Sequence, residues 1–260
     1  MASAFELTVE DFVEDIEAIR ALVVAFADSK YQPKSRIAAA NSATLLVAAT
    51  FEEFVREMAR DYARAVVNGA PSFDKLPGSL ASTAWKRTMD GLGKVKFDTH
   101  GKANDIFAIA HAKFSVIYDF CKGDLSKDIY RELIHNENNM HPGQINALFK
   151  VSGLKDVCEQ CSHKQSLLDM FGETQHGKAH GKLLAGLNHF FERRNEIAHA
   201  LNSGQSNSPE QIQTDIDMLI GFGQALREVL EDLAPKPFVP AAASAPAQEP
   251  LAAPEQVPSA

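Results

Sequence analysis

Apolar residues recur along most of this chain at the three- and four-residue spacing of amphipathic helices. The first such segment covers about residues 8–28. Thr8 and Asp11 have the spacing of a helix-capping box, so the sequence predicts that this helix begins near Thr8 and ends before Pro33. The positions that define its apolar face are Phe12, Ile16, Ile19, Val23 and Phe26.

A second predicted helix covers about residues 35–68, with Ser35 as its capping residue. Its first half is apolar nearly all round, which indicates a helix buried deep in a bundle. Its second half carries many charged residues and is predicted to present a solvated face. These residues are Glu52, Glu53, Arg56, Glu57, Arg60, Asp61 and Arg64.

Two further long helices are predicted at about residues 178–201 and 208–233. Leucine, phenylalanine and isoleucine recur at helical spacing in both segments. The last helix has strong start signals, because Ser208 can cap it and Pro209 stands at the first helical position. The four long segments together predict an all-α protein whose core is an up-and-down four-helix bundle.

The segment between the second and third long helices, about residues 70–177, is less regular. Proline and glycine interrupt it repeatedly, and it contains shorter helical patterns at about 104–120, 126–136 and 144–151. It is therefore interpreted as a helical insertion in one domain, residues 1–233. Residues 234–260 are rich in proline and alanine and are predicted to form a disordered tail.

Composition narrows the classes of function. The net charge of -8 argues against a protein that coats nucleic acid unspecifically, since such binding needs broad basic surfaces. Three cysteines are too few for a disulfide framework and favour a reducing compartment. The N-terminus lacks the features of a signal peptide, and no apolar run reaches the roughly 20 residues that span a bilayer. We therefore expect a cytoplasmic protein without a membrane partner.

One short motif carries the candidate chemistry. The end of the third long helix reads Arg194-Asn195-Glu196-Ile197-Ala198-His199, an arginine, a polar residue and then a histidine five positions after the arginine. This pattern, followed by a capped amphipathic helix, resembles the signature of HEPN superfamily ribonucleases. The segments NSATLLVAATFEEFVREM and INALFKVSGL strengthen the likeness to the RiboL-PSP branch, over about Val9 to Asp232. Ala200 departs from the glycine that is frequent at this position in the family.

The resemblance implies a metal-independent endoribonuclease that needs no cofactor. In such a reaction the 2′-OH of RNA attacks the adjacent phosphorus, which leaves a 2′,3′-cyclic phosphate. Imidazole titrates near neutral pH and can transfer protons, so His199 is a candidate for that role. Arg194 can offer a fork of donors to phosphate. Asn195 lies four residues before His199, on the same helical face, and could orient it.

Helical geometry separates Arg194 and His199 by about 140° around the helix axis, so their spacing alone does not bring them together. The resemblance implies that the motifs of two protomers meet in one cleft of a homodimer. Local positive charge in that cleft would let an acidic protein bind RNA. The candidate substrate-binding residues are Arg193, Lys182 and Glu52. The family also suggests a toxin or anti-phage effector acting on tRNA, mRNA or phage RNA, with a possible neutralising antitoxin.

Two alternatives remain open at this point. The chain could be a non-catalytic HEPN-like dimer that binds RNA, a nucleotide or a protein, with Arg194 and His199 as structural residues. Cys158, Cys161, His176 and His180 also have the spacing of a structural zinc site, although the cysteines can equally lie in an apolar core with Leu154 and Val157. Three histidines without a partner pattern are interpreted as surface or core residues. They are His141, His163 and His189.

Overall fold

The computed structural model describes residues 2–28, 30–95, 103–135, 139–199 and 207–239. Every regular element in these ranges is a helix, which confirms the predicted all-α class. The α-helices are α1 (Ala4–Ala27), α2 (Pro33–Gly69), α3 (Gly78–Gly93), α4 (Ala103–Cys121), α5 (Tyr130–Leu133), α6 (Pro142–Lys150), α7 (Val157–Ser162), α8 (Gln165–Phe171), α9 (His176–His199) and α10 (Pro209–Leu233), with a 3-10 turn at Phe73–Lys75. No described helix is long and apolar enough to cross a membrane.

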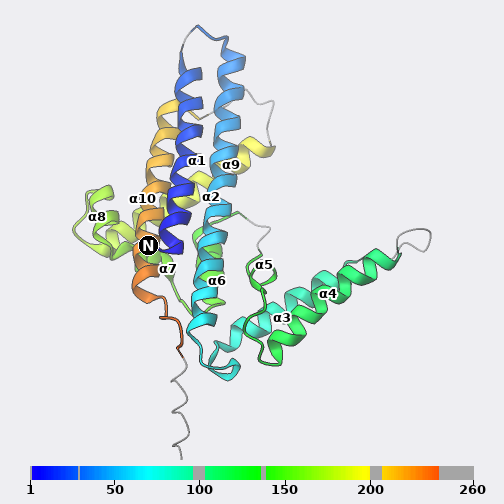
Figure 1. Ribbon diagram of the computed structural model, residues 1–260. Helices are drawn as coiled ribbons and strands as arrows, with labels where there is room; N and C mark the ends of the chain where they lie inside the picture. The colour runs from blue at the N-terminus through cyan, green and yellow to red at the C-terminus, as the bar shows by residue number, and fades with distance from the viewer. Residues whose placement is uncertain (1, 29, 96–102, 136–138, 200–206, 240–260) are drawn as a thin grey trace, which may run out of the picture.

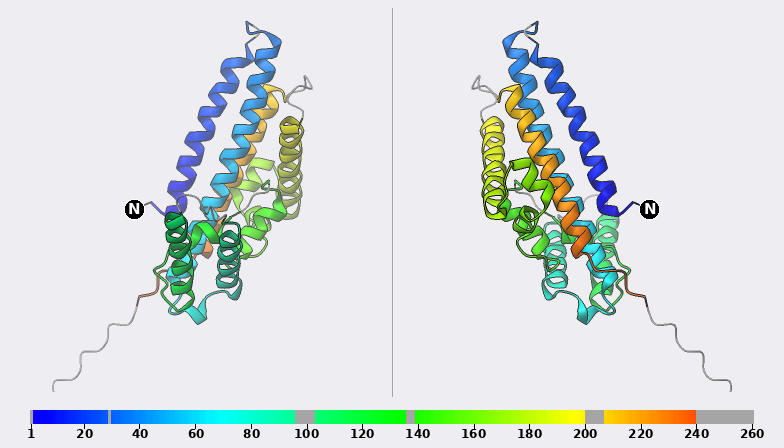
Figure 2. Two further views of the ribbon diagram at one scale, coloured as in Figure 1. Left: turned by 90° about the vertical axis from the view of Figure 1, so that its right-hand side faces the viewer. Right: turned by 90° about the vertical axis from the view of Figure 1, so that its left-hand side faces the viewer.

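Four long helices, α1, α2, α9 and α10, form an up-and-down bundle (Figures 1 and 2). Helix α2 packs against the other three. Each of the four contributes one phenylalanine to a shared aromatic centre. The fully buried ring of Phe51 on α2 lies 6.2 Å from Phe12 of α1, 6.2 Å from Phe191 of α9 and 5.9 Å from Phe222 of α10, measured between ring centroids. Such tilted ring pairs stabilise a core beyond the burial of their area.

The first helix begins earlier than the sequence predicted. Ser3 is the N-cap and forms a reciprocal capping box with Glu6, so the predicted cap at Thr8 was wrong. Phe5 is buried and extends the apolar face by one turn, which favours the earlier start. Thr8 instead lies within α1 and donates a hydrogen bond of 3.0 Å to Asp61 of α2. Helix α2 likewise starts at Pro33, ahead of the predicted Ser35 cap.

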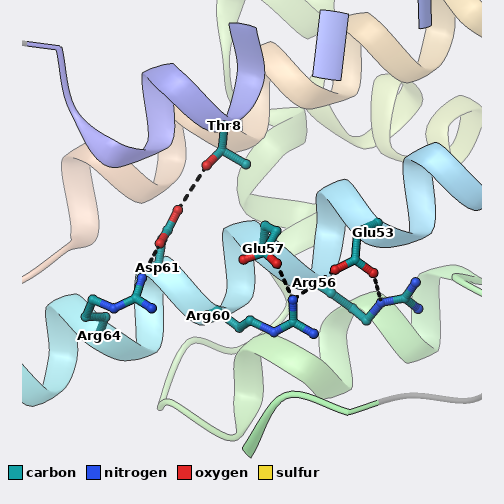
Figure 3. Close-up of polar contacts among 7 residues, drawn as sticks. All are labelled: Thr8, Glu53, Arg56, Glu57, Arg60, Asp61 and Arg64. Atoms are coloured by element: carbon teal, nitrogen blue, oxygen red, sulfur yellow. Dashed lines mark hydrogen bonds and ion pairs between the residues drawn. The ribbon is translucent and has the colours of Figure 1, made fainter. Parts of the chain in front are cut away.

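The charged half of α2 forms a ladder of ion pairs along its outer face (Figure 3). Arg60 bridges Glu53, at 2.9 Å, and Glu57. Arg56 contacts Glu53 at 2.9 Å, and Arg64 contacts Asp61 at 2.6 Å. These arginines are therefore matched by carboxylates of the same helix. The face is less solvated than the sequence predicted, since the side chains of Arg56, Arg60 and Asp61 are only 17%, 14% and 12% exposed. A phosphate would have to displace a carboxylate to bind there.

The insertion after α2 divides into two parts. Helices α3 and α4 pack side by side and project away from the bundle as an arm (Figure 1). Helices α6, α7 and α8 instead pack against the bundle, with α7 contacting both α9 and α10. The predicted helix at 126–136 is a single turn, α5, because the chain must turn back from the arm there. The predicted helix at 144–151 is present as α6.

The C-terminal segment leaves the bundle directly after α10. Residues 234–239 are non-helical, and the Phe238 amide donates a hydrogen bond of 2.8 Å to the Asn68 carbonyl at the end of α2. Pro235 lies so close to Gly69 that a Cβ on Gly69 would stand 2.6 Å from the proline ring. Residues 240–260, the rest of the predicted tail, lie outside the described residues.

Candidate active site

An open polar pocket of about 410 Å³ lies between the end of α9 and the start of α6. Arg194, Asn195 and His199 all line it, although helical spacing sets Arg194 and His199 well apart around the axis. They share the pocket although α9 remains helical through His199. The opposite wall consists of residues that are distant in sequence: Asn139, His141, Gly143 and Gln144.

Asn195 connects the two walls of this pocket. Its Oδ1 accepts a hydrogen bond of 2.6 Å from Asn139 and one of 3.2 Å from the guanidinium of Arg194. The side-chain contacts described for Asn195 are thus with Arg194 and Asn139, whereas the sequence suggested His199 as its neighbour. Asn195 holds the guanidinium in place, and Arg194 also lines the pocket, where a guanidinium can donate to an anion.

Glu52 of α2 lies close enough to Arg194 to interact with it electrostatically. Its side chain is only 14% exposed. Burial raises the pKa of Glu52 above its usual value, and the positive charges of Arg194 and Arg56 partly offset this effect. Glu52 Oε1 and Arg194 Nε are both buried atoms without a hydrogen-bond partner among the described residues. The Glu52 carboxylate therefore partly balances the charge of Arg194.

Two predicted substrate-binding residues point elsewhere. Arg193 contacts both carboxylate oxygens of Asp215 on α10, at 2.6 and 2.7 Å. Lys182 pairs with Glu173 at 2.7 Å and donates to the Phe171 carbonyl. Neither residue is among those that line the pocket in the described part of the chain. Of the predicted residues, the structure brings together Arg194, Asn195 and His199, with Glu52 adjacent to Arg194.

The Arg193–Asp215 pair joins α9 to α10, and its loss should destabilise the bundle. Asp215 is 7% exposed, and burial raises its pKa despite the hydrogen bonds from Arg193. We expect Asp215→Ala to lower the free energy of unfolding by about 3 kcal/mol, because it strands a partly buried guanidinium. Urea denaturation would measure this. Asp217→Ala is the matched control on α10: that side chain is 66% exposed, and we expect a loss below about 1 kcal/mol.

The cysteine pair considered for zinc lies in the core. Cys158 and Cys161 on α7 are fully buried beside Val157, and Leu154 is buried in the same cluster. Burial raises the pKa of Cys158 to about 12 and that of Cys161 well above its usual value, so both thiols are neutral in the metal-free protein. No group of three or more potential ligands is placed to hold a metal among the described residues.

Sequence reasoning missed the second wall of the pocket. His141 was interpreted as a surface or core histidine, and Asn139 and Gln144 were not considered. One feature of the sequence could have pointed to His141. The tripeptide His141-Pro142-Gly143 lies just before INALFKVSGL, one of the segments that carried the family resemblance. Helix α6 includes the first residues of that segment and places its N-terminal end against α9.

The up-and-down bundle with an Arg-polar-x-x-x-His motif at a polar pocket is the arrangement expected of a HEPN-type domain. The RiboL-PSP-HEPN family model matches residues 10–232, and the chain therefore belongs to this family. HEPN domains are generally ribonucleases or RNA-binding modules, which sets the broad class of activity. Searches of curated proteins and of solved structures gave no match.

Proposed function

We propose that this protein is a metal-independent endoribonuclease whose active site is the pocket at the end of α9. The observation that carries the proposal is that Arg194, Asn195 and His199 line a single open pocket. In the reaction, Arg194 binds the scissile phosphate and stabilises the charge of the phosphorane. Asn195 positions Arg194, and His199 transfers a proton. The products are a 2′,3′-cyclic phosphate and a 5′-hydroxyl.

The charge distribution supports a local phosphate site. The arginines of the α2 ladder form close ion pairs with carboxylates, whereas the hydrogen-bond partner described for Arg194 in the pocket is the neutral amide of Asn195. An acidic protein can thus present one cationic group to RNA without a broad basic surface. His199 is exposed at the end of α9. This exposure is compatible with a homodimer in which a second protomer approaches the same cleft. The biological setting we propose is a toxin or anti-phage effector acting on tRNA, mRNA or phage RNA, with or without a neutralising antitoxin.

The direct experiment compares RNA with DNA of the same sequence in the presence of excess EDTA. The proposal predicts that the purified protein cuts the RNA and leaves the DNA intact, because only RNA supplies the attacking 2′-hydroxyl. RNA binding without cleavage, with or without added divalent ions, would instead favour a non-catalytic HEPN-like binding module.

The buried Glu52 carboxylate gives a prediction about substrate affinity. Its negative charge opposes a phosphate at Arg194, so we expect Glu52→Gln to lower the KM for RNA several-fold at neutral pH. Because the folded protein disfavours charged Glu52, the substitution should cost less than about 1 kcal/mol of stability. Glu53→Gln is the control, since Glu53 pairs with Arg56 and Arg60 in the ladder. A higher KM in Glu52→Gln would show that Glu52 itself binds substrate.

A further inference from the structure

His141 is held firmly at the pocket wall opposite the motif. It is the N-cap residue of α6, and its carbonyl accepts the first hydrogen bonds of that helix, from Gln144 at 2.8 Å and Ile145 at 3.0 Å. Its ring packs on the ring of Phe191, with 5.5 Å between centroids. Its Nδ1 lies 2.9 Å from Oδ1 of Asn188. Phe191 and Asn188 both belong to α9, so these two contacts fix the imidazole against the helix that carries the motif.

The bond to Asn188 selects the tautomer of His141. An amide oxygen can only accept, so Nδ1 of His141 must carry the hydrogen. In the neutral ring, Nε2 is then the unprotonated nitrogen with an available lone pair. Since His141 lines the pocket together with Arg194 and His199, a base and a proton donor can face the same phosphate.

We propose that His141 is the general base of the cleavage reaction and His199 the general acid. This assignment rests on the proposed ribonuclease function. His141 Nε2 removes the proton of the 2′-hydroxyl as O2′ forms its bond to phosphorus. The bond between phosphorus and O5′ breaks, and the imidazolium of His199 donates its proton to the departing O5′. One chain thus holds both proton-transfer groups.

The two roles can be separated with RNA that contains a single 5′-bridging sulfur at the scissile position. A thiolate leaves without protonation, so this substrate does not need a general acid but still needs a base. On ordinary RNA, His141→Ala and His199→Ala should each lose at least about a hundredfold in rate. On the sulfur substrate, His199→Ala should recover to within about tenfold of wild type, whereas His141→Ala should stay defective.

Added imidazole and a second variant distinguish loss of the base from misfolding of the His141→Ala protein. Imidazole in solution should restore cleavage by His141→Ala if only the base is missing. Asn188→Ala keeps the histidine but removes the bond that sets its tautomer, and its rate should fall about tenfold. Wild-type activity in His141→Ala, or equal recovery of both variants on the sulfur substrate, would overturn the assignment of His141. Wild-type activity in His199→Ala on ordinary RNA would instead overturn the proposed function.

A different observation concerns the arm formed by α3 and α4. Its surface exposes several aromatic side chains, which elsewhere in the described chain are mostly buried. Trp85 contacts Phe114 edge-on at 6.2 Å, Phe114 stacks on Tyr118 at 5.8 Å, and the amine of Lys122 lies 5.7 Å from the Tyr118 centroid. The exposed fractions of the three rings are 38%, 39% and 44%. Phe114 and Tyr118 are one helical turn apart on α4, and Lys122 follows directly after the end of that helix.

The charge of the arm differs in sign from that of the whole protein. Its described residues, 78–95 and 103–122, contain five lysines and arginines against three aspartates, although the chain carries a net charge of -8. Rings beside basic groups are the combination that binds single-stranded nucleic acid, because bases stack on the rings and the cations attract the backbone. The like charge of a second arm disfavours pairing of two arms. The arm leaves the bundle on the side where α5 and α9 lie (Figure 1).

We infer that the arm binds single-stranded RNA through Trp85, Phe114 and Tyr118. Trp85 is the only tryptophan in the chain, so its fluorescence reports on this surface alone. A single-stranded RNA 12-mer titrated into His199→Ala protein should quench the emission of Trp85, and an RNA duplex should quench it far less. Tyr118→Ala should weaken binding at least about fivefold, whereas Leu46→Ala, which alters an exposed apolar residue on α2, should not.

Unchanged Trp85 emission on RNA binding, or unchanged affinity in Tyr118→Ala, would overturn this second inference. A change in Trp85 emission with protein concentration and without RNA would show that the arm contacts another copy of the chain instead. Because the titration needs no cleavage, its failure is distinct from failure of the proposed ribonuclease activity.

Discussion

His199→Ala protein is expected to cleave RNA about a thousandfold more slowly than wild type. Proton transfer by a positioned side chain typically contributes this much, within a range of about a hundredfold to ten-thousandfold. The side chain is exposed at the end of α9, so its removal should change the free energy of unfolding by less than about 0.5 kcal/mol. Single-turnover cleavage of a labelled RNA in EDTA, with urea denaturation alongside, measures both quantities.

His189→Ala is the matched control for this substitution. His189 is also exposed on α9, about one and a half turns before the motif, and it is not among the residues that line the pocket in the described chain. It should retain wild-type rates. Equal activity in the two variants would mean that His199 takes no part in the chemistry.

Arg194→Ala should lower kcat/KM by a factor of about 100 to 1000, the usual cost of removing one charged donor that stabilises a developing anion. Arg194→Lys should restore little of this. The guanidinium is held by Asn195 and balanced by Glu52, and a lysine amine cannot provide the same planar set of donors. Steady-state kinetics on a single-site RNA substrate would give both values.

Arg64→Ala provides the comparison for loss of a cation outside the pocket. Arg64 pairs with Asp61 on the α2 ladder (Figure 3), so kcat/KM should stay within about twofold of wild type. If Arg194→Lys were as active as wild type, the argument for a fork of donors on the phosphate would be wrong. A loss in Arg64→Ala as large as in Arg194→Ala would point to a general effect of charge.

The four long helices were predictable because their apolar periodicity is strong over many turns. Their ends were less so. Thr8 with Asp11 and Ser3 with Glu6 both have cap spacing, and only the burial of Phe5 against the bundle selects the earlier start. The helix predicted at 126–136 is only one turn long, because the chain reverses there between the arm and the bundle. Local helix propensity does not report such a reversal.

In the candidate active site, the motif predicted the residues of α9 that line the pocket but not those that come from the segment around the start of α6. Arg194, Asn195 and His199 stand close together in sequence. Asn139 and His141 reach the same pocket only because the start of α6 packs on α9, which no local pattern reveals.

Arg193 and Arg194 show a second limit of the sequence. They are adjacent and identical, and about 100° of helix rotation turns one toward Asp215 and the other toward the pocket. The sequence could not distinguish the structural arginine from the candidate catalytic one.

The most direct measurement is the mass of the fragment upstream of the cut when wild-type protein cleaves a defined RNA in excess EDTA. The account predicts a fragment that ends in a 2′,3′-cyclic phosphate and a downstream fragment with a 5′-hydroxyl, and it predicts that His199→Ala forms both about a thousandfold more slowly. A fragment that ends in a 3′-hydroxyl, or cleavage that appears only after a divalent metal is restored, would contradict it.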